Sequence, residues 1–583
     1  MNFLKNIISS AIGFMMAVGL LFILTIILIV SFSDDTGVKV SKTSILKIEL
    51  NAEIKDYAPL DVDPFSNLLG LPPKFVGLNK IITSINKAKL DPRIKGVTIE
   101  VGNLGAGISQ LSSIRDAVLD FKKSGKFVMA YSDSYDQKGY FLSSAADSVF
   151  VSPVGQVDFK GLSSEILFFK DFQDKYGVKM EVIRHGKYKS AVEPFLDNKM
   201  SASNRTQMEE LLNSLWGDIV EAISISRDVS VEKLNSIADG LLGRTAQLSV
   251  KNNLVDSSVY RDDYKVKLKN LVNGEDYKLI SLVDYIATDI SFDFEEDKES
   301  NKIAVIYAQG EIIYGKGDEE TIGQIMMVKA IEKAAKDKSI KAIVLRVNSP
   351  GGSALASDLI WRALEVAKKE KPLVVSMGNY AASGGYYISC NANRIFTEST
   401  TITGSIGVFG LLPNANELTD KMGIYSEKVS TNKSPSYSPF EELDPRFYAV
   451  TKEGVDLVYK TFVSKVSKGR DMSYESVHEL AQGRVWSGKQ AVENGLADEI
   501  GGLDDAIASA VSLAKIEDYK IKSFPDYNKD LRESFQNMPF MNIKNNLVKE
   551  LLGDQNFMLF NQLNNLKNKE GIQMRMPYVL DIK

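Results

Sequence analysis

The residues best suited to chemistry lie in residues 376–387, SMGNYAASGGYY, which follow a short apolar, β-branched run. Lys371 and Pro372 end a predicted helix, and residues 373–375 are predicted to form a buried strand. The glycines then allow a tight turn, and the next helix is predicted to begin near Ser383. The unpaired N–H groups and the dipole of a helix N-terminus favour negative charge. The turn can therefore present Ser383 as a nucleophile.

A serine hydroxyl needs a neighbouring base at neutral pH, and the chain offers few ordinary ones. It has two histidines. His478, in YESVHELA, has the surroundings of a helix surface, whereas His185, in RHGKYKSAVEPF, has polar neighbours and a glycine. A buried, neutral lysine is the other base that serves serine nucleophiles, because burial lowers its pKa. By spacing alone, Lys187 and Lys189 are equal candidates, and His185 stays open.

Four motifs in a fixed order carry a family resemblance: YKSAVEPF around Lys189, RVNSPGGS at 346–353, NYAASGGYY around Ser383 and TGSIGVFG at 403–410. Together they resemble the long form of the bacterial signal peptide peptidase A (protease IV) family, from about residue 45 to about residue 515. The resemblance selects Lys189 as the base for Ser383. It assigns the oxyanion-binding N–H groups to Gly352 and Gly384. Ser405, in the fourth motif, is a candidate to orient the lysine amine.

The same resemblance implies a Clp-protease/crotonase-like fold of stacked β-β-α units. It also implies a homo-oligomeric ring or bowl, a tetramer in this family, whose active sites face an enclosed chamber. The implied activity is a serine endopeptidase that cuts membrane-derived peptides, above all cleaved signal peptides. It needs neither ATP nor a metal, so no cofactor is expected.

An internal repeat organises the elements that position these residues. Short β-rich runs alternate with helical patterns from residue 44, which predicts an α/β fold. Residues 94–141 align without a gap with residues 340–387, an offset of 246, as in IKGVTIEV on IKAIVLRV. We therefore expect two tandem Clp-protease/crotonase-like domains preceded by one N-terminal transmembrane helix.

The two copies differ where the chemistry is. Ser383 aligns with Gln137, and PGGS at 350–353 aligns with LGAG at 104–107. Conversely, Ser434 stands opposite Lys189 when the two Pro-Phe pairs are matched. Each repeat thus carries half of a Ser-Lys dyad. The halves meet either within one chain or between two chains, and covalent linkage favours the first.

The chain divides into five predicted parts. Residues 1–6 are a cytoplasmic N-terminus, and residues 7–32 are long and apolar enough for a transmembrane helix. No small-x-small cleavage signature follows, so we expect an uncleaved, single-pass signal anchor in the inner membrane, with the catalytic part on the periplasmic or extracytoplasmic side. Lys39, Lys42 and Lys47 oppose this orientation. Residues 44–300 form the lysine-bearing repeat, 301–520 the serine-bearing repeat, and 521–583 a tail without a functional interpretation.

The composition argues against a nucleic-acid-binding function and against an internal disulfide. The net charge of −5 and pI near 5.6 argue against a nucleic-acid partner. The single cysteine, Cys390, excludes an internal disulfide and is predicted to be a small buried filler.

Two other classes of function stay open. An acyl-CoA hydratase or isomerase would use the same fold and the same glycines without a serine nucleophile. A non-catalytic membrane scaffold would use neither the glycines nor the serine for chemistry. Labelling by a covalent serine probe and loss of turnover in Ser383→Ala separate these classes from a peptidase.

Overall fold

A computed structural model describes residues 10, 13–14, 16–17, 19–21, 39–58, 75–101, 104–288, 301–527 and 572–576. The predicted membrane anchor, residues 7–32, lies mostly outside this part of the chain. The few residues of it that are described are helical and exposed. Within the described part, the helices are all too short or too polar to cross a bilayer.

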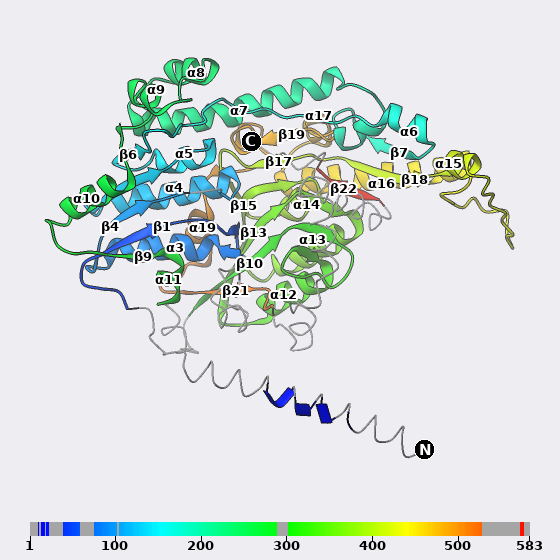
Figure 1. Ribbon diagram of the computed structural model, residues 1–583. Helices are drawn as coiled ribbons and strands as arrows, with labels where there is room; N and C mark the ends of the chain where they lie inside the picture. Colours follow the sequence, from blue (N-terminus) through cyan, green and yellow to red (C-terminus); the bar gives the residue numbers. More distant parts are fainter. Residues whose placement is uncertain are drawn as a thin grey trace.

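The first repeat is built on a parallel sheet of six strands, in the order β8-β6-β5-β4-β1-β9 (Figure 1). Its central strands are apolar and almost fully buried, as expected when helices cover both faces of a parallel sheet. The strands are β1 (Ser44–Ile48), β4 (Ile94–Ile99), β5 (Phe127–Ser132), β6 (Ser148–Val151), β8 (Ser257–Ser258) and β9 (Lys278–Ser281). The helices are α3 (Leu78–Leu90), α4 (Ile108–Lys122), α5 (Gln137–Ser143), α7 (Ala202–Arg227), α8 (Val231–Asp239), α9 (Ala246–Lys251), α10 (Arg261–Leu271) and α11 (Leu282–Ala287).

The second repeat has a sheet of eight strands, with the path β19-β17-β15-β13-β10-β21; β16 pairs with β15, and β20 pairs with β16. All its pairings are parallel except that of β17 with β19. The strands are β10 (Lys302–Gln309), β13 (Ile340–Ser349), β15 (Leu373–Ala382), β16 (Arg394–Thr397), β17 (Ile402–Gly404), β19 (Val485–Ser487), β20 (Glu499–Ile500) and β21 (Lys520–Phe524). The helices are α12 (Gln324–Lys336), α13 (Ala354–Ala367), α14 (Gly384–Ser389), α16 (Pro445–Arg470), α17 (Tyr474–Leu480), α18 (Gly488–Glu493) and α19 (Leu503–Ala514).

The predicted α/β fold and internal repeat are confirmed element by element. Helices α3 and α12 both have 13 residues and both follow a glycine. Helices α7 and α16 both have 26 residues, and both end at an aspartate in the left-handed conformation, Asp228 and Asp471. In each repeat a serine, Ser230 or Ser473, then caps the next helix by accepting a backbone hydrogen bond.

A third, mixed sheet joins the repeats and the C-terminal tail, in the order β12-β11-β14-β22-β18-β7. All seven residues of β7, from the first repeat, pair antiparallel with β18 of the second. The strands are β7 (Lys179–His185), β11 (Glu311–Ile313), β12 (Thr321–Gly323), β14 (Gly351–Ser353), β18 (Val408–Asn414) and β22 (Gln573–Arg575). The remaining elements are β2 (Glu53–Lys55), β3 (Phe75–Gly77), α6 (Lys170–Tyr176), the 3-10 helix η1 (Ser190–Phe195) and α15 (Asn416–Lys421).

The expected division at residue 520 falls on the first residue of β21. This strand pairs with β10, so the second sheet continues to Phe524. The expected division near residue 300 adjoins residues 289–300, which are outside the described part.

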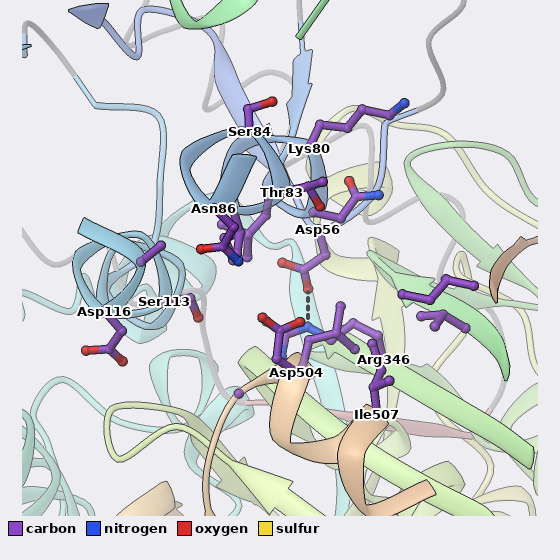
Figure 2. A pocket seen from close by; sticks show the side chains of 18 of the residues that line it. Asp56, Lys80, Thr83, Ser84, Asn86, Ser113, Asp116, Arg346, Asp504 and Ile507 are labelled. Carbon is purple, nitrogen blue, oxygen red and sulfur yellow. Dashed lines mark hydrogen bonds and ion pairs between the residues drawn. The ribbon is translucent and has the colours of Figure 1, made fainter. Parts of the chain in front are cut away.

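The two repeats also meet at a buried ion pair beside a cavity of about 530 Å³ (Figure 2). The Nε of Arg346, on β13, lies 3.2 Å from a carboxylate oxygen of Asp56, and both side chains are almost fully buried. Asp116, Glu398 and Asp504 also line this cavity, and burial raises the pKa of Glu398 to about 7. Lys189, Gly352, Ser383, Gly384 and Ser405, which are described below, do not line it. The contact therefore fixes the repeats against each other at a distance from the candidate chemistry.

Candidate active site

Ser383 lies between the end of β15 and the start of α14, as the sequence predicts. Its backbone has a positive φ of 55° with ψ −111°, which is strained for a residue with a Cβ. Two backbone hydrogen bonds hold Ser383 in this conformation. Its N–H donates to the Gly404 carbonyl at 2.8 Å, and its carbonyl accepts from the Tyr387 N–H at 2.8 Å. The turn thus fixes the direction of a hydroxyl that is fully buried in this structure.

Lys189 reaches the serine from the other repeat. It is separated by three residues from the end of β7 and lies directly before η1, and the pairing of β7 with β18 places it against the second repeat. Its Nζ lies 2.9 Å from the Oγ of Ser383. The same nitrogen lies 3.0 Å from the Oγ and 3.2 Å from the carbonyl oxygen of Ser405. One chain therefore brings together Ser383, Lys189 and Ser405.

The lysine amine sits in an environment that disfavours its charge. Lys189 is fully buried, and the ring of Phe409 is centred 5.9 Å from Nζ. Burial lowers the pKa of Lys189 well below its ordinary value. A neutral amine accepts one hydrogen bond and donates two. It can therefore accept the Ser383 hydroxyl proton while it donates to the two oxygens of Ser405.

The two glycines expected to bind an oxyanion lie next to the serine. Gly384 is the first residue of α14, where N–H groups have no helical acceptor. Gly352 is in β14, and this strand runs close to the start of α14: a Cβ on Gly351 would be 2.7 Å from the Gly384 nitrogen. Gly352 has φ 155°, and a side chain there would collide with Ile312. Both glycines therefore permit a close approach of backbones.

The other candidate bases are elsewhere. His185 shares a 2.6 Å hydrogen bond with Asp456 and stacks on Tyr459, and His478 bonds to the same tyrosine. The Lys187 side chain is exposed. Ser434, the residue aligned with Lys189 in the second repeat, is exposed in the connection between α15 and α16. Among the alternatives that spacing left open, only Lys189 contacts the serine.

Sequence reasoning missed Gly483, against which the lysine backbone packs. Gly483 has φ 86°, and a Cβ there would be 2.6 to 2.7 Å from the N, Cα and Cβ atoms of Lys189. Its N–H also donates to the Ile406 carbonyl at 2.8 Å. Gly483 lies outside the four motifs, and only the packing shows its contact with the lysine.

We expect Gly483→Ala to lower kcat about 100-fold, because misplacing a catalytic group by about 1 Å has this effect. We also expect a loss of about 1–3 kcal/mol of stability from strain at positive φ. Peptidase assays and thermal unfolding would measure the two effects. The control is Gly217→Ala, in the middle of α7, where a Cβ would meet nothing within 4 Å. Equal activity in both variants would contradict the packing argument.

Comparison with known proteins identifies the family. The model of peptidase family S49 matches residues 120–275 and 365–517, one segment in each repeat. The chain belongs to peptidase family S49. It is similar to Protease 4 of Haemophilus influenzae, with 37% identity over 88% of this chain and 87% of that protein. It is also similar to the chloroplastic serine protease SPPA of Arabidopsis thaliana, with 32% identity over 82% of this chain and 70% of that one.

Membership of this family establishes a serine peptidase, in place of the hydratase and scaffold alternatives. The family match includes both Lys189 and Ser383, one in each segment. A solved ClpP1 variant from Listeria monocytogenes aligns with 35% of this chain and 94% of its own, with 14% identity and a TM-score of 0.24.

Proposed function

We propose that this S49 peptidase uses a Ser383-Lys189 dyad. The observation that carries the proposal is the 2.9 Å contact between Lys189 Nζ and Ser383 Oγ in a fully buried site. As Ser383 Oγ bonds to the peptide carbonyl carbon, the neutral amine of Lys189 takes the hydroxyl proton. The resulting ammonium then gives this proton to the departing amine. A water molecule then attacks the acyl-enzyme ester in the same way, gives its proton to Lys189, and releases the acyl group from Ser383 Oγ.

Gly352 and Gly384 supply N–H groups to the oxygen that becomes negative in the tetrahedral intermediate. Each such donor typically contributes about 3 kcal/mol to transition-state stabilisation. Ser405 holds the lysine amine through its hydroxyl and its carbonyl, which keeps the amine directed at Ser383. No metal or cofactor takes part in these steps.

The proposed substrates are cleaved signal peptides and other membrane-derived peptides, as the family resemblance implies. The apolar residues 7–32 support a single-pass anchor in the inner membrane with the catalytic part outside the cytoplasm. Such an anchor would keep the enzyme where signal peptides remain after secretion. The proposed assembly is a homo-oligomer, a tetramer by resemblance.

The test is hydrolysis by the full chain in detergent of a peptide with a leucine-rich signal-peptide core, beside a polar peptide of equal length. We expect cleavage of the apolar peptide, and labelling of Ser383 by a fluorophosphonate that mass spectrometry locates. Labelling of a residue other than Ser383 would contradict the dyad. Preference for the polar peptide would contradict the proposed substrate class.

A further inference from the structure

The turn at residues 104–107 of the first repeat aligns with the oxyanion turn of the second repeat, and the proposed chemistry gives it no role. Gly107 takes the place of Ser353 in this alignment. Ser353 caps its own helix, α13: its hydroxyl accepts a hydrogen bond from the N–H of Ala356, three residues later, at 3.4 Å. Gly107 stands at the same position before α4 but has no side chain that could accept this bond.

The second repeat supplies the cap that α4 lacks. The N–H of Gln110, three residues after Gly107, donates to the Oδ1 atom of Asn379 at 3.1 Å. Accepting a hydrogen bond from this N–H is what the side chain of an N-cap residue does. Asn379 fits because position 107 is a glycine: a Cβ there would lie 2.3 to 2.4 Å from three atoms of the Asn379 side chain. Asn379 therefore caps a helix of the other repeat.

Asn379 lies at an irregularity in the strand that ends at the nucleophile. Between Met377 and Ala381, the pairing of β13 with β15 advances by two residues on β13 and by four on β15. Residues 378–380 are therefore not paired with β13. Bulges of this kind redirect a strand and are frequent next to active sites. Ser383 follows four residues after Asn379, so the direction of the strand at this irregularity decides where the nucleophile lies.

A buried polar network connects the same stretch of β15 to the first repeat. The Nε2 of Gln110 donates to Asp56 Oδ1 at 3.0 Å, and Asp56 forms the ion pair with Arg346 (Figure 2). The Nη1 of Arg346 then donates to the Ser376 hydroxyl at 2.7 Å and to the Met377 carbonyl at 3.1 Å. The start of α4 thus holds β15 both by a direct contact and through this network.

We propose that Asn379 is a positioning residue: seated on the turn at residues 104–107, it fixes the end of β15 and so holds Ser383 at the correct distance from Lys189. The inference rests on the proposed function of this dyad. Lys189 belongs to the first repeat and Ser383 to the second, so a contact between the repeats just before the serine bears directly on the 2.9 Å separation of Nζ and Oγ. The repeat without the nucleophile therefore also aligns the nucleophile.

The test compares Asn379→Ala with Asn379→Asp in the full chain in detergent. Asn379→Ala removes the acceptor. We expect kcat for a peptide with a leucine-rich core, and the rate at which a fluorophosphonate labels Ser383, to fall by about 10- to 100-fold, the effect of misplacing a catalytic group by about 1 Å. Asn379→Asp keeps an oxygen acceptor at the N-terminus of the helix and should keep both rates close to those of the wild type.

A double variant separates positioning from stability. In Gly107→Ser/Asn379→Ala the introduced hydroxyl caps α4 from within its own repeat, as Ser353 does for α13. Gly107 already has the extended backbone of an N-cap residue, with φ −83° and ψ 164°. Asn379→Ala should lower Tm by about 2–4 °C through loss of one cap, and the double variant should regain this stability. Its kcat should stay low, because the contact between the repeats is still missing.

Asn393→Ala is the matched control. The Oδ1 of Asn393 accepts a hydrogen bond from the N–H of Leu373 at 2.9 Å, at the opposite end of β15 from Ser383. This variant loses the same kind of hydrogen bond to the same stretch of chain. It should keep both kcat and the labelling rate, because the end of β15 next to the serine is untouched.

The outcomes separate the positioning role from the proposed function. If the wild type neither cleaves the peptide nor is labelled at Ser383, the proposed function fails. If the wild type is active and Asn379→Ala is equally active, the positioning role alone fails. Recovery of kcat together with Tm in the double variant would overturn it, as would an equal loss in Asn393→Ala or no rescue in Asn379→Asp. If Asn379→Ala does not fold, the double variant decides, and failure of both to fold would assign Asn379 to folding instead.

Discussion

Ser383→Ala is expected to lower peptide hydrolysis by about 10⁴- to 10⁶-fold, the range found when a nucleophile that acts as a unit with its base is removed. The fold should persist, because the turn is held by the backbone bonds of residue 383 to Gly404 and Tyr387. The side chain contributes the contact with Lys189 and a weak one, at 3.5 Å, to the Gly407 carbonyl. Alanine can keep the turn while removing the nucleophile.

The measurement is kcat/KM with a fluorogenic peptide, together with thermal unfolding to show that the variant is folded. Ser389→Ala is the matched control. Ser389 is a buried serine at the end of the same helix, and its hydroxyl donates to the Gly385 carbonyl at 2.7 Å. The Ser389→Ala variant should retain peptide turnover. Full activity in Ser383→Ala would refute the assignment of the nucleophile.

Lys189→Met is expected to be inactive and, at neutral pH, more stable than the wild type. Methionine fills a similar volume but cannot take a proton from Ser383. It also removes the cost of burying an amine in a site where burial lowers its pKa. Lys187→Met, at the exposed lysine two residues earlier, is the control and should change neither property.

The stability gain of Lys189→Met over the wild type should decrease as the pH rises. The folded state holds Lys189 neutral at a pH where the unfolded chain, with an ordinary lysine pKa near 10.4, binds a proton. Between the two pKa values the unfolded state binds more protons, so wild-type stability rises with pH by up to about 1.4 kcal/mol per unit. The advantage of Lys189→Met should therefore shrink as the pH approaches 10. Denaturant unfolding at pH 7, 8 and 9 would measure it.

The activity of the wild type should rise over the range in which Lys189 loses its proton in the folded state. A gain in stability that stays constant from pH 7 to 9 would contradict a neutral lysine. Turnover retained in Lys189→Met would direct attention to another base.

The sequence by itself determined the alternation of strands and helices, the internal repeat and the turn at Ser383. These features follow from local properties: apolar strands separated by helical patterns, two similar segments at a constant offset, and small residues at the start of a helix. The sequence also located the two glycine turns, because a glycine pair after a buried strand is a local signal. It selected Lys189 only through a family motif, since Lys187 and His185 were equally placed along the chain.

Only the tertiary structure decided which base reaches the serine and which strands β22 pairs with. Lys189 differs from Lys187 by its burial, which results from the pairing of β7 with β18, more than 200 residues apart. The strand β22 has three residues, and although apolar and polar residues alternate over 572–576, so short a run in the tail gives no indication that it pairs with β14. Strand pairing between distant segments depends on how the repeats pack, so the partner in neither contact is marked along the chain.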